Sequence, residues 1–439
     1  MKLYFLLIIL AAFTFIYPQS SKLQSGPMVG YSEMREVALW LQTTQPAKVK
    51  ISYWDKKNPK HKYFTDEKTT KKEEGFTSTL IADEVEPGRH YNYEVYIDEK
   101  PIQLKQPCEF QTLKLWQWRE DPPEFSFVAG SCAYVNESQY DRPGKPYGGN
   151  YEIYNSIFER HPDFMVWLGD NYYLREPDWN SWTGIIKRIT HTRSLPEMQP
   201  LLSSVHNYAI WDDHDFGPNN SDRSFIHKDL TLKAFKLFWP ALSYGVNDKP
   251  GIASKFEWGD AEFFMMDDRY YRSPDDSKTG KRELLGKDQL KWLIEALVSS
   301  NATFKFIAIG GQVLSTEEAS ETYLTYKEER EELLTAIKNE GLTGVIFLTG
   351  DRHFSEITKL EREGTYPLYD FTLSTMSAGP SKPDPAKNTL RVPGTLVTER
   401  NFGLFKITGP KNDRVLNCKL FNKDGVELWS YDISANTLK

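Results

Sequence analysis

Side chains that bind metal ions are crowded into one short stretch, "YAIWDDHDFGPNN", residues 208–220. An apolar run ends there, and three aspartates, one histidine and two asparagines follow. Carboxylates held close together repel one another and resist ionisation. A polyvalent cation removes that difficulty, and aspartate, histidine and asparagine are ordinary ligands for one. The stretch therefore predicts one wall of a metal site.

Four other apolar runs end on the same kinds of residue: "FSFVAG" before Ser131-Cys132, "FMVWLG" before Asp170, "FFMM" before Asp267-Asp268-Arg269, and "VIFLTG" before Asp351-Arg352-His353. Short runs of this composition are typical of strands buried on both faces of a parallel sheet. Ligands in open α/β sheets bind beyond the carboxyl ends of the strands. Five such ends would gather a thiol, several carboxylates and two imidazoles at one edge.

Each of these residues also has a purely structural interpretation. An aspartate that follows a strand, such as Asp170, is commonly a helix N-cap or a turn residue. Cys132 alone is more often a small buried apolar residue, and His214 alone is more often a hydrogen-bonded polar residue. Five strand ends of one kind in a single region favour metal binding over unrelated structural roles.

Two kinds of element must position these residues. From residue 124 onward, apolar runs alternate with helical patterns, such as "KDQLKWLIEAL" at residues 287–297. This alternation predicts an α/β domain over residues 124–439. A proline-rich loop at 379–394 would either shape a substrate entrance or serve as a plain connector.

Residues 21–113 have a different character, with segments rich in β-branched and aromatic residues separated by turn signals. About seven strands at this spacing predict a small β-sandwich. The stretch "EVEPGRHYNYEVYID", residues 84–98, resembles fibronectin type III domains, in which a Pro-Gly turn leads into a tyrosine-bearing strand. We expect a fibronectin III or immunoglobulin-like domain at 21–115, joined to the α/β domain by a linker at 118–123.

The bulk composition limits the partners. The chain has 439 residues and a net charge of −7, so it has no general attraction for nucleic acid or anionic membranes. Its three cysteines, Cys108, Cys132 and Cys418, do not form a disulfide framework.

The first residues read as a targeting segment. Residues 1–20, "MKLYFLLIILAAFTFIYPQS", combine a basic start, an apolar run and a proline break, which predicts a secretory signal peptide. A retained anchor is the alternative. No later apolar stretch is long enough to cross a bilayer, so we expect a periplasmic or extracellular protein with no membrane span after signal removal.

Four motifs then become recognisable together: "AGSCAY", "WLGDNYY", "WDDHDFGPNN" and "TGDRHFSE". In this order they resemble the motifs of PhoD-like alkaline phosphatases over roughly residues 20–435. That family implies a calcineurin-like metallophosphatase α/β/β/α sandwich, here preceded by a small all-β sandwich domain. It also implies an exported hydrolase that acts on phosphoric ester bonds.

The resemblance implies a dinuclear or larger centre of Fe3+ and Ca2+. Cys132 and Tyr173 would ligate the iron as thiolate and phenolate, which a hard trivalent ion stabilises, and Asp170 would bridge. Calcium would take oxygen ligands. The implied metal ligands are Cys132, Asp170, Tyr173, Asp212, Asp213, Asn220, Asp351 and His353.

The implied mechanism is attack of a metal-bound hydroxide on phosphorus, with the metals and an arginine stabilising the developing charge. Asp170, His214, Arg269 and His353 are the predicted catalytic residues. Arg188 or Arg193 is a second choice for the arginine. The two histidines could be ligands, phosphate contacts or proton donors, and the sequence does not separate these roles.

Some residues depart from the better-known family members. Asn171 replaces an aromatic residue, Leu174 an acidic one, and Gln312 stands where the wider calcineurin-like group has a histidine ligand. These departures affect the metal identity and the substrate range more than the reaction type.

Three other functions compete with a phosphatase. A phosphodiesterase or phospholipase D-type hydrolase would use the same centre on phosphate diesters. A purple acid phosphatase also has a tyrosinate–iron bond, but it needs several histidine ligands, and this chain has eight histidines with few in suitable places. A non-enzymatic extracellular binding protein is the least favoured. The expected partner is a small phosphate ester or phosphodiester, and the expected state is a monomer.

Overall fold

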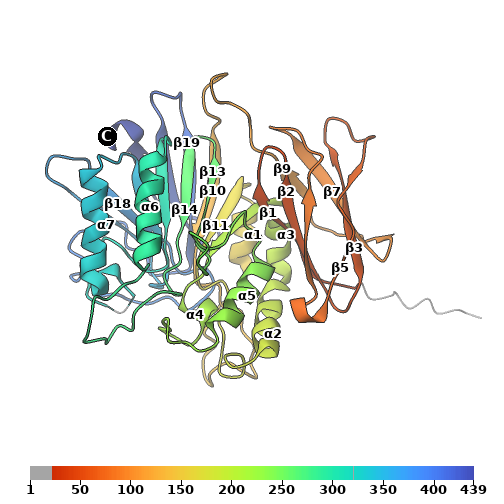
Figure 1. The fold of residues 1–439 in the computed structure, drawn as a ribbon, viewed down its shortest axis with the longest axis horizontal. Coiled ribbons are helices and arrows are strands. Elements are labelled where there is room, and N and C mark those ends of the chain that lie inside the picture. The colour runs from red at the N-terminus through yellow and green to blue at the C-terminus, as the bar shows by residue number, and fades with distance from the viewer. Residues whose placement is uncertain (1–21, 320) are drawn as a thin grey trace, which may run out of the picture.

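The computed structural model describes residues 22–319 and 321–439. The predicted signal peptide at 1–20 lies outside the described residues. Figure 1 shows β-strands of the N-terminal region on one side, two further sheets in the middle, and helices on both outer sides of those sheets. No helix among the described residues combines the length and the apolar character that crossing a bilayer requires.

The N-terminal region consists of strands, as its sequence predicts. β7 (His90–Ile97) alternates exposed or half-buried residues with buried ones, which is the period of a strand with one face on a core. The strands form two sheets, β1-β2-β6 and β4-β3-β7-β8, with β5 paired to β3 and β9 to β7. The other bounds are β1 Leu23–Ser32, β2 Val37–Thr43, β3 Lys48–Asp55, β4 Tyr63–Phe64, β5 Lys68–Thr69, β6 Thr77–Ala82, β8 Lys100–Pro101 and β9 Glu109–Gln111.

The first central sheet contains three parallel strands that are buried along most of their length. They are β10 (Phe125–Gly130), β11 (Phe164–Leu168) and β12 (His206–Ile210). An antiparallel meander of β19 (Asn401–Thr408), β20 (Val415–Asn422) and β21 (Glu427–Ser434) extends this sheet beyond β10.

The second central sheet has the order β13-β14-β15-β16-β18-β17. β14, β15, β16 and β18 are parallel, and the two edge strands are antiparallel. The bounds are β13 Ser254–Trp258, β14 Ala261–Met265, β15 Phe304–Ala308, β16 Val345–Thr349, β17 Glu356–Leu360 and β18 Leu368–Thr372.

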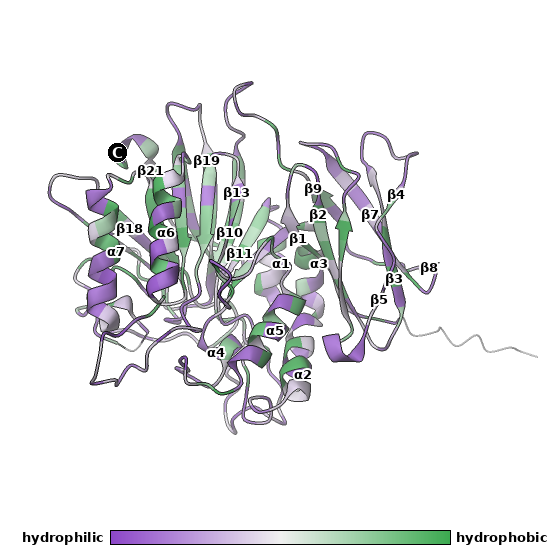
Figure 2. Ribbon diagram, viewed as in Figure 1, coloured by the Kyte–Doolittle hydropathy of each residue, from purple (hydrophilic) through white to green (hydrophobic). Residues whose placement is uncertain are grey.

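Aromatic side chains join the two central sheets face to face. The ring of Phe127 on β10 lies 5.1 Å from that of Phe263 on β14 and 5.3 Å from that of Phe306 on β15. Figure 2 shows the strands of these sheets largely in the hydrophobic colour. Burial of this apolar surface is the main force that holds the layers together.

Helices cover the outer faces of the two sheets. α6 (Lys287–Ser299) and α7 (Lys327–Asn339) lie on one side, and α1, α2, α3 and α5 lie on the other, towards the N-terminal strands (Figure 1). α6 and α7 carry both colours in Figure 2, as amphipathic helices do. The remaining helices are α1 Glu152–Phe158, α2 Trp182–Arg193, α3 Gln199–Ser204, α4 Asp213–Phe216 and α5 Lys228–Phe238.

The N-terminal sandwich is joined to the rest more closely than the sequence suggested. β1 pairs in parallel with β12 through Val29 and His206, so that β1, β2 and β6 continue the first central sheet to nine strands. Met28 and Trp40 belong to the same apolar core as the central strands. The pairing satisfies backbone groups that an edge strand would leave open. The division at 21–115 and 124–439 stays a prediction.

Candidate metal centre

The parallel strands β10, β11 and β12 end side by side, which brings together three of the motifs predicted from the sequence. Gly130 at the end of β10 is in register with Trp167 on β11, and Leu168 at the end of β11 is in register with Ile210 at the end of β12. The residues that follow these ends are therefore neighbours across the edge of the sheet. β16 of the second sheet ends beside β11, because a Cβ added at Gly350 would lie 2.7 Å from the carbonyl oxygen of Leu168, and the motif that holds Asp351 and His353 begins there.

The backbone at this edge is strained in a consistent way. Cys132, Asp170, Asn220, Asp351 and His353 all have positive φ, between 53° and 63°. Non-glycine residues rarely adopt this left-handed region, and it concentrates at functional sites, where the surrounding structure holds it. At four of these positions, all but the exposed Asn220, the side chain belongs to one of the groups of potential ligands described next.

Three groups of potential metal-binding side chains result. They are Cys132 with Asp170 and His353, Asp170 with Asp213 and His214, and Asp212 with Glu321 and Asp351. In each group, one ligand atom per residue lies within 4.8 Å of those of the other two. The structure thus brings together all the sequence-predicted aspartates and both histidines.

Several polar atoms in these groups, and one of the neighbouring Asp268, are buried without a hydrogen-bond partner among the described residues. They include Asp170 Oδ2, Asp212 Oδ2, Asp268 Oδ1, Glu321 Oε1 and His214 Nδ1. Buried polar groups are almost always paired, because leaving one unpaired costs about 1–3 kcal/mol, and more when it is charged. Acidic oxygens and an imidazole nitrogen are the atoms that cations bind, so the centre fits metal ions.

The electrostatics point the same way. Burial, and after it the charges of Asp213 and Cys132, raise the pKa of Asp170 well above its ordinary value. Burial and the charge of Glu321 raise the pKa of Asp351 to about 7. Carboxyl groups that resist ionisation in the protein alone are stabilised as carboxylates by bound cations.

Asp213 is the exception among these carboxyl groups. Burial opposes its ionisation, but the charges of His214 and Arg269 hold the pKa of Asp213 below its ordinary value. Its oxygens also accept hydrogen bonds from the backbone N–H groups of Asn220, at 2.6 Å, and His214, at 2.9 Å. These contacts fold the "DDHDFGPNN" stretch around one carboxylate.

Cys132 and Tyr173 form the most apolar corner of the centre. Cys132 has no exposed surface, and its burial and the charge of Asp351 raise the pKa of the thiol to about 12. Burial and the charge of Asp170 raise the pKa of the Tyr173 phenol well above its ordinary value. Without a cation both groups are neutral, and deprotonating them requires a strong positive charge nearby.

The two histidines differ in their contacts. His353 Nδ1 lies 2.6 Å from the carbonyl oxygen of Gly379, and its Nε2 lies 3.3 Å from the Tyr173 hydroxyl. The hydrogen bond to Gly379 orients the ring, so Nε2 faces the centre. The His214 ring packs 4.3 Å from that of Tyr173, and its Nδ1 has no partner among the described residues.

Arg269 is placed differently from what the sequence indicated. It has no exposed surface, its Nε contacts Asp212, and its Nη2 donates to Glu321 at 2.7 Å. A guanidinium held by two carboxylates has little capacity left for a phosphate. Gly310 packs against the carboxyl groups of Asp212 and Asp268, because an added Cβ there would lie 2.6 Å from Asp268 Oδ2.

Neither of the other predicted arginines faces the centre. Arg188 is paired with Asp178 and Glu137. Arg193 stacks on Trp239, with its guanidinium carbon 3.9 Å from the ring centroid.

Gln312, which stands where the wider calcineurin-like group has a histidine ligand, is bound to other side chains. It donates from Nε2 to Glu356 and Thr372, each at 2.9 Å.

Sequence reasoning missed Glu321. It follows no strand, and it lies in the loop before the short turn Tyr323–Tyr326. Its place beside Asp212 and Asp351 depends on the fold of a loop that has no motif. The only local signal is the acidic stretch "STEEASE", residues 315–321, which reads as a solvated loop.

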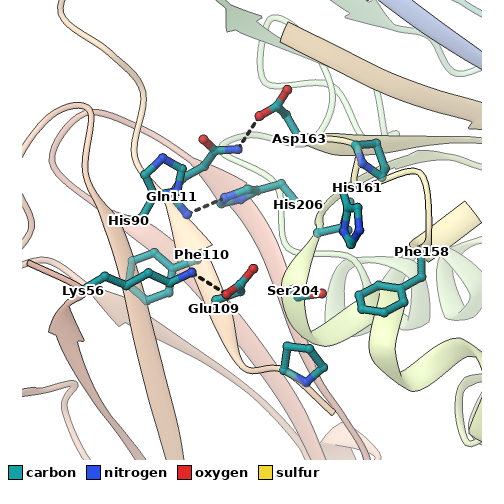
Figure 3. Close-up of a pocket in the computed structure, with 13 residues that line it drawn as sticks. Lys56, His90, Glu109, Phe110, Gln111, Phe158, His161, Asp163, Ser204 and His206 are labelled. Atoms are coloured by element: carbon teal, nitrogen blue, oxygen red, sulfur yellow. Dashed lines mark hydrogen bonds and ion pairs between the residues drawn. The ribbon is translucent and has the colours of Figure 1, made fainter. Parts of the chain in front are cut away.

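A second group of acidic and histidine residues lies at the opposite, amino ends of β11 and β12. These residues line a pocket of about 280 Å³, and Figure 3 shows how their side chains lie around it. Gln111 donates from Nε2 to Asp163 at 2.8 Å and from its backbone N–H to His206 Nε2 at 3.2 Å. His206 Nδ1 is 2.9 Å from the carbonyl oxygen of Gly30. These contacts close the seam between the N-terminal strands and the sheet.

Comparison with solved structures identifies the class of fold. A structure described as that of PhoD aligns with a TM-score of 0.77 at 18% identity, over 96% of this chain and 94% of that one. A purple acid phosphatase from yellow lupin (Lupinus luteus) aligns with a TM-score of 0.66 at 13% identity, over 93% and 74% of the two chains. The fold is therefore that of the calcineurin-like metallophosphatases, with an N-terminal β-rich region.

Sequence comparison identifies the family. Residues 127–402 match the model of the PhoD-like phosphatases, and residues 20–114 match a domain of unknown function. Alkaline phosphatase D of Bacillus subtilis is 25% identical in an alignment of 287 positions that covers 54% of this chain and 47% of that protein. The chain thus spans about half the length of the curated relative it matches. The chain belongs to the PhoD-like phosphatase family, as its four motifs predicted.

Proposed function

We propose that this chain is an exported, metal-dependent phosphatase that hydrolyses phosphate esters. Family membership supports the reaction class. The observation that carries the proposal is the set of buried acidic oxygens without partners, from Asp170, Asp212 and Glu321, that converge beyond the strand ends. Buried acidic oxygens without partners destabilise the protein when no metal is bound, and bound cations would remove this cost.

The donor sets differ enough to hold two kinds of metal. Cys132, Tyr173, Asp170 and His353 would hold Fe3+, since thiolate and phenolate need a strongly charged ion. Asp212, Asp213, Asn220 and Asp351 would hold Ca2+, which prefers oxygen ligands. Glu321 joins the second set by its position beside Asp212 and Asp351. Asp170 belongs to two of the groups, which suits a bridging carboxylate.

When bound, the metal ions would supply Lewis acidity toward the phosphoryl oxygens and lower the pKa of the attacking water. The chain's own residues have separate tasks. His214, whose Nδ1 has no partner among the described residues, would move a proton to the leaving oxygen, while His353 would serve as a metal ligand. Arg269 holds Asp212 and Glu321 in place, so we assign it a positioning role. The buried walls exclude bulk water.

The central experiment combines metal analysis, spectroscopy and hydrolysis assays on the purified protein. We expect iron and calcium, and a visible charge-transfer band that is lost in Cys132→Ala or Tyr173→Phe. We also expect release of phosphate from p-nitrophenyl phosphate. A colourless, metal-free and fully active protein would contradict the metal assignment, and a metal-loaded protein inactive on every phosphate ester would contradict the function.

Phosphate diesters provide the second arm of this experiment. A phosphodiesterase or phospholipase D-type enzyme would use the same centre, so bis-p-nitrophenyl phosphate and a phospholipid are assayed in parallel. A higher kcat/KM on the diester would favour that alternative. Export is tested separately, by N-terminal sequencing of the mature protein, which should begin near residue 21.

A further inference from the structure

Arg175 lies beside the metal centre in a position that the sequence did not single out. It stands two residues after Tyr173, in the loop between β11 and α2, and only 7% of its surface is exposed. Its Nε donates to the Tyr134 hydroxyl at 3.3 Å. Its guanidinium carbon lies 4.9 Å from the ring centroid of Tyr134 and 5.7 Å from that of Tyr173.

No carboxylate among residues 22–319 and 321–439 lies within ion-pair distance of the Arg175 guanidinium. Three other buried arginines differ in this respect: Arg188 is paired with Asp178, Arg269 with Asp212, and Arg414 with Asp260. Burying an unpaired charge is costly, because the low-polarity surroundings replace its hydration poorly. A buried arginine without a carboxylate partner is stabilised when an anion binds to it.

Arg193 is a useful contrast. It also lacks a carboxylate within ion-pair distance among the described residues, but its guanidinium stacks 3.9 Å from the Trp239 ring and 5.4 Å from the Trp40 ring. Burial lowers the pKa of Arg193 to about 9. Its charge is thus held between indole rings, away from the metal centre. Arg175 has more distant ring contacts and lies next to a metal-ligand candidate.

The neighbours of Arg175 connect it to both the centre and the solvent. The Tyr134 ring lies 5.0 Å from that of Tyr147, which is 41% exposed. Tyr147 in turn lies 3.1 Å from His353 Nδ1 through its hydroxyl. Arg175 therefore lies beside Tyr134 and the ligand candidate Tyr173, one contact away from the partly exposed Tyr147. Metal ions at the centre would repel its charge unless an anion lay between them.

We propose that Arg175 binds a non-bridging oxygen of the substrate's phosphate group and selects phosphate monoesters over diesters. This inference rests on the proposed function. A monoester has three non-bridging oxygens, so one remains for the arginine when two face the metals. A diester has only two, and its third substituent is an ester oxygen with little charge. The guanidinium therefore stabilises the monoester more strongly.

The test compares Arg175→Met and Arg175→Lys with the control Lys187→Met. Lys187 is an exposed cation on the nearby helix α2, where it contacts Tyr140. For Arg175→Met we expect kcat/KM on p-nitrophenyl phosphate to fall about 100-fold. On bis-p-nitrophenyl phosphate we expect a fall of less than about 10-fold. Arg175→Lys should recover part of the monoester rate, and Lys187→Met should stay within about twofold of the parent protein.

A binding measurement gives a readout that does not depend on turnover. Calorimetric titration of the metal-loaded protein with inorganic phosphate should give a Kd raised at least about 10-fold in Arg175→Met and unchanged in Lys187→Met. The Tm without phosphate should not fall, since the variant removes an unpaired buried charge. An unchanged phosphate Kd, or equal losses on both esters, would overturn the proposal.

The same titration separates the two proposals. A parent protein that binds phosphate through Arg175 but hydrolyses no phosphate ester would contradict the proposed function and leave the anion site standing. If the parent protein hydrolyses monoesters and Arg175→Met hydrolyses them at the same rate, the proposed function stands and the role of Arg175 is contradicted.

Discussion

The two ends of β11 and β12 carry the same kinds of residue but differ in how completely those residues are hydrogen-bonded. At the amino ends, Asp163 accepts hydrogen bonds from Gln111 and from the Ser126 N–H, and both ring nitrogens of His206 have partners. At the carboxyl ends, Asp170 Oδ2 and Asp212 Oδ2 have none among the described residues.

The contrast shows that residue type alone does not mark function. Aspartate and histidine are buried in both places, and in both places burial shifts their pKa values away from ordinary. What differs is the hydrogen-bond inventory: the seam is complete within the chain, and the centre is incomplete. Stability should therefore depend on the seam and activity on the centre, which gives four predictions.

The largest effect is expected at the centre. Asp170→Asn should lower kcat/KM for phosphate ester hydrolysis at least about 1,000-fold, or ~4 kcal/mol, because it removes the carboxylate shared by two ligand groups. The Tm of the metal-free protein should stay equal or rise, because one member of a repelling set is gone. A large drop in that Tm would mean that Asp170 is a structural residue like those of the seam.

Arg269→Met tests whether the centre also contains a structural part. Removing the cation leaves Asp212 buried without a cationic partner among the described residues and Glu321 with only the 3.6 Å contact to Arg272 Nη1, so the free energy of unfolding should fall by about 3–5 kcal/mol. Denaturant titration measures it, with the exposed Arg223→Met as the control. Normal stability with weakened phosphate binding would instead restore Arg269 as a phosphate contact.

His206 should make the stability of the seam depend on pH. Burial lowers the pKa of His206 to about 4, so between that value and about 6.5 the unfolded chain binds a proton that the folded chain does not. Stability then falls as the pH falls through this window, by up to about 3 kcal/mol.

The measurement compares the metal-free parent protein with His206→Gln between pH 7 and pH 4. The variant has no titrating group at this position, so its stability should vary less across the window. Asp163 and His90, the titratable neighbours, are retained in both proteins, and the difference isolates His206. Identical pH profiles would contradict the prediction.

The smallest effect is expected for Asp163→Asn. The amide presents a donor where the carboxylate accepts from Gln111 or Ser126, so we expect a loss of about 1–2 kcal/mol in stability. Hydrolysis should remain within about twofold of the parent rate. A strong loss of activity with normal stability would break the comparison between the two ends.

Much of the centre could be predicted because its residues follow strands. Cys132, Asp170, Asp212 and Asp351 each come within two residues of the end of an apolar run, and parallel strands bring such positions together whatever the loops do. The apolar runs also predicted β10, β11, β12, β14 and β16, since buried parallel strands have a strong compositional signal.

The rest depended on contacts between segments far apart in the sequence. Glu321 comes from a loop that has no periodicity, and the partners of Arg269 are 57 and 52 residues away. Arg175 is distinguished by a guanidinium with no carboxylate within ion-pair distance among the described residues, which no local pattern records. The pairing of β1 with β12 joins residues 29 and 206, and neither strand's composition identifies its partner.

That pairing has a practical consequence for anyone who shortens the chain. A fragment that begins at residue 116 would lose β1, β2 and β6, and the edge of β12 that pairs with β1 would become a free sheet edge. Open strand borders recruit other molecules, so such a fragment should precipitate or form higher-order species even though it retains every metal-binding candidate. Strands β1, β2 and β6 thus protect the sheet that carries the candidate metal centre from pairing with other molecules.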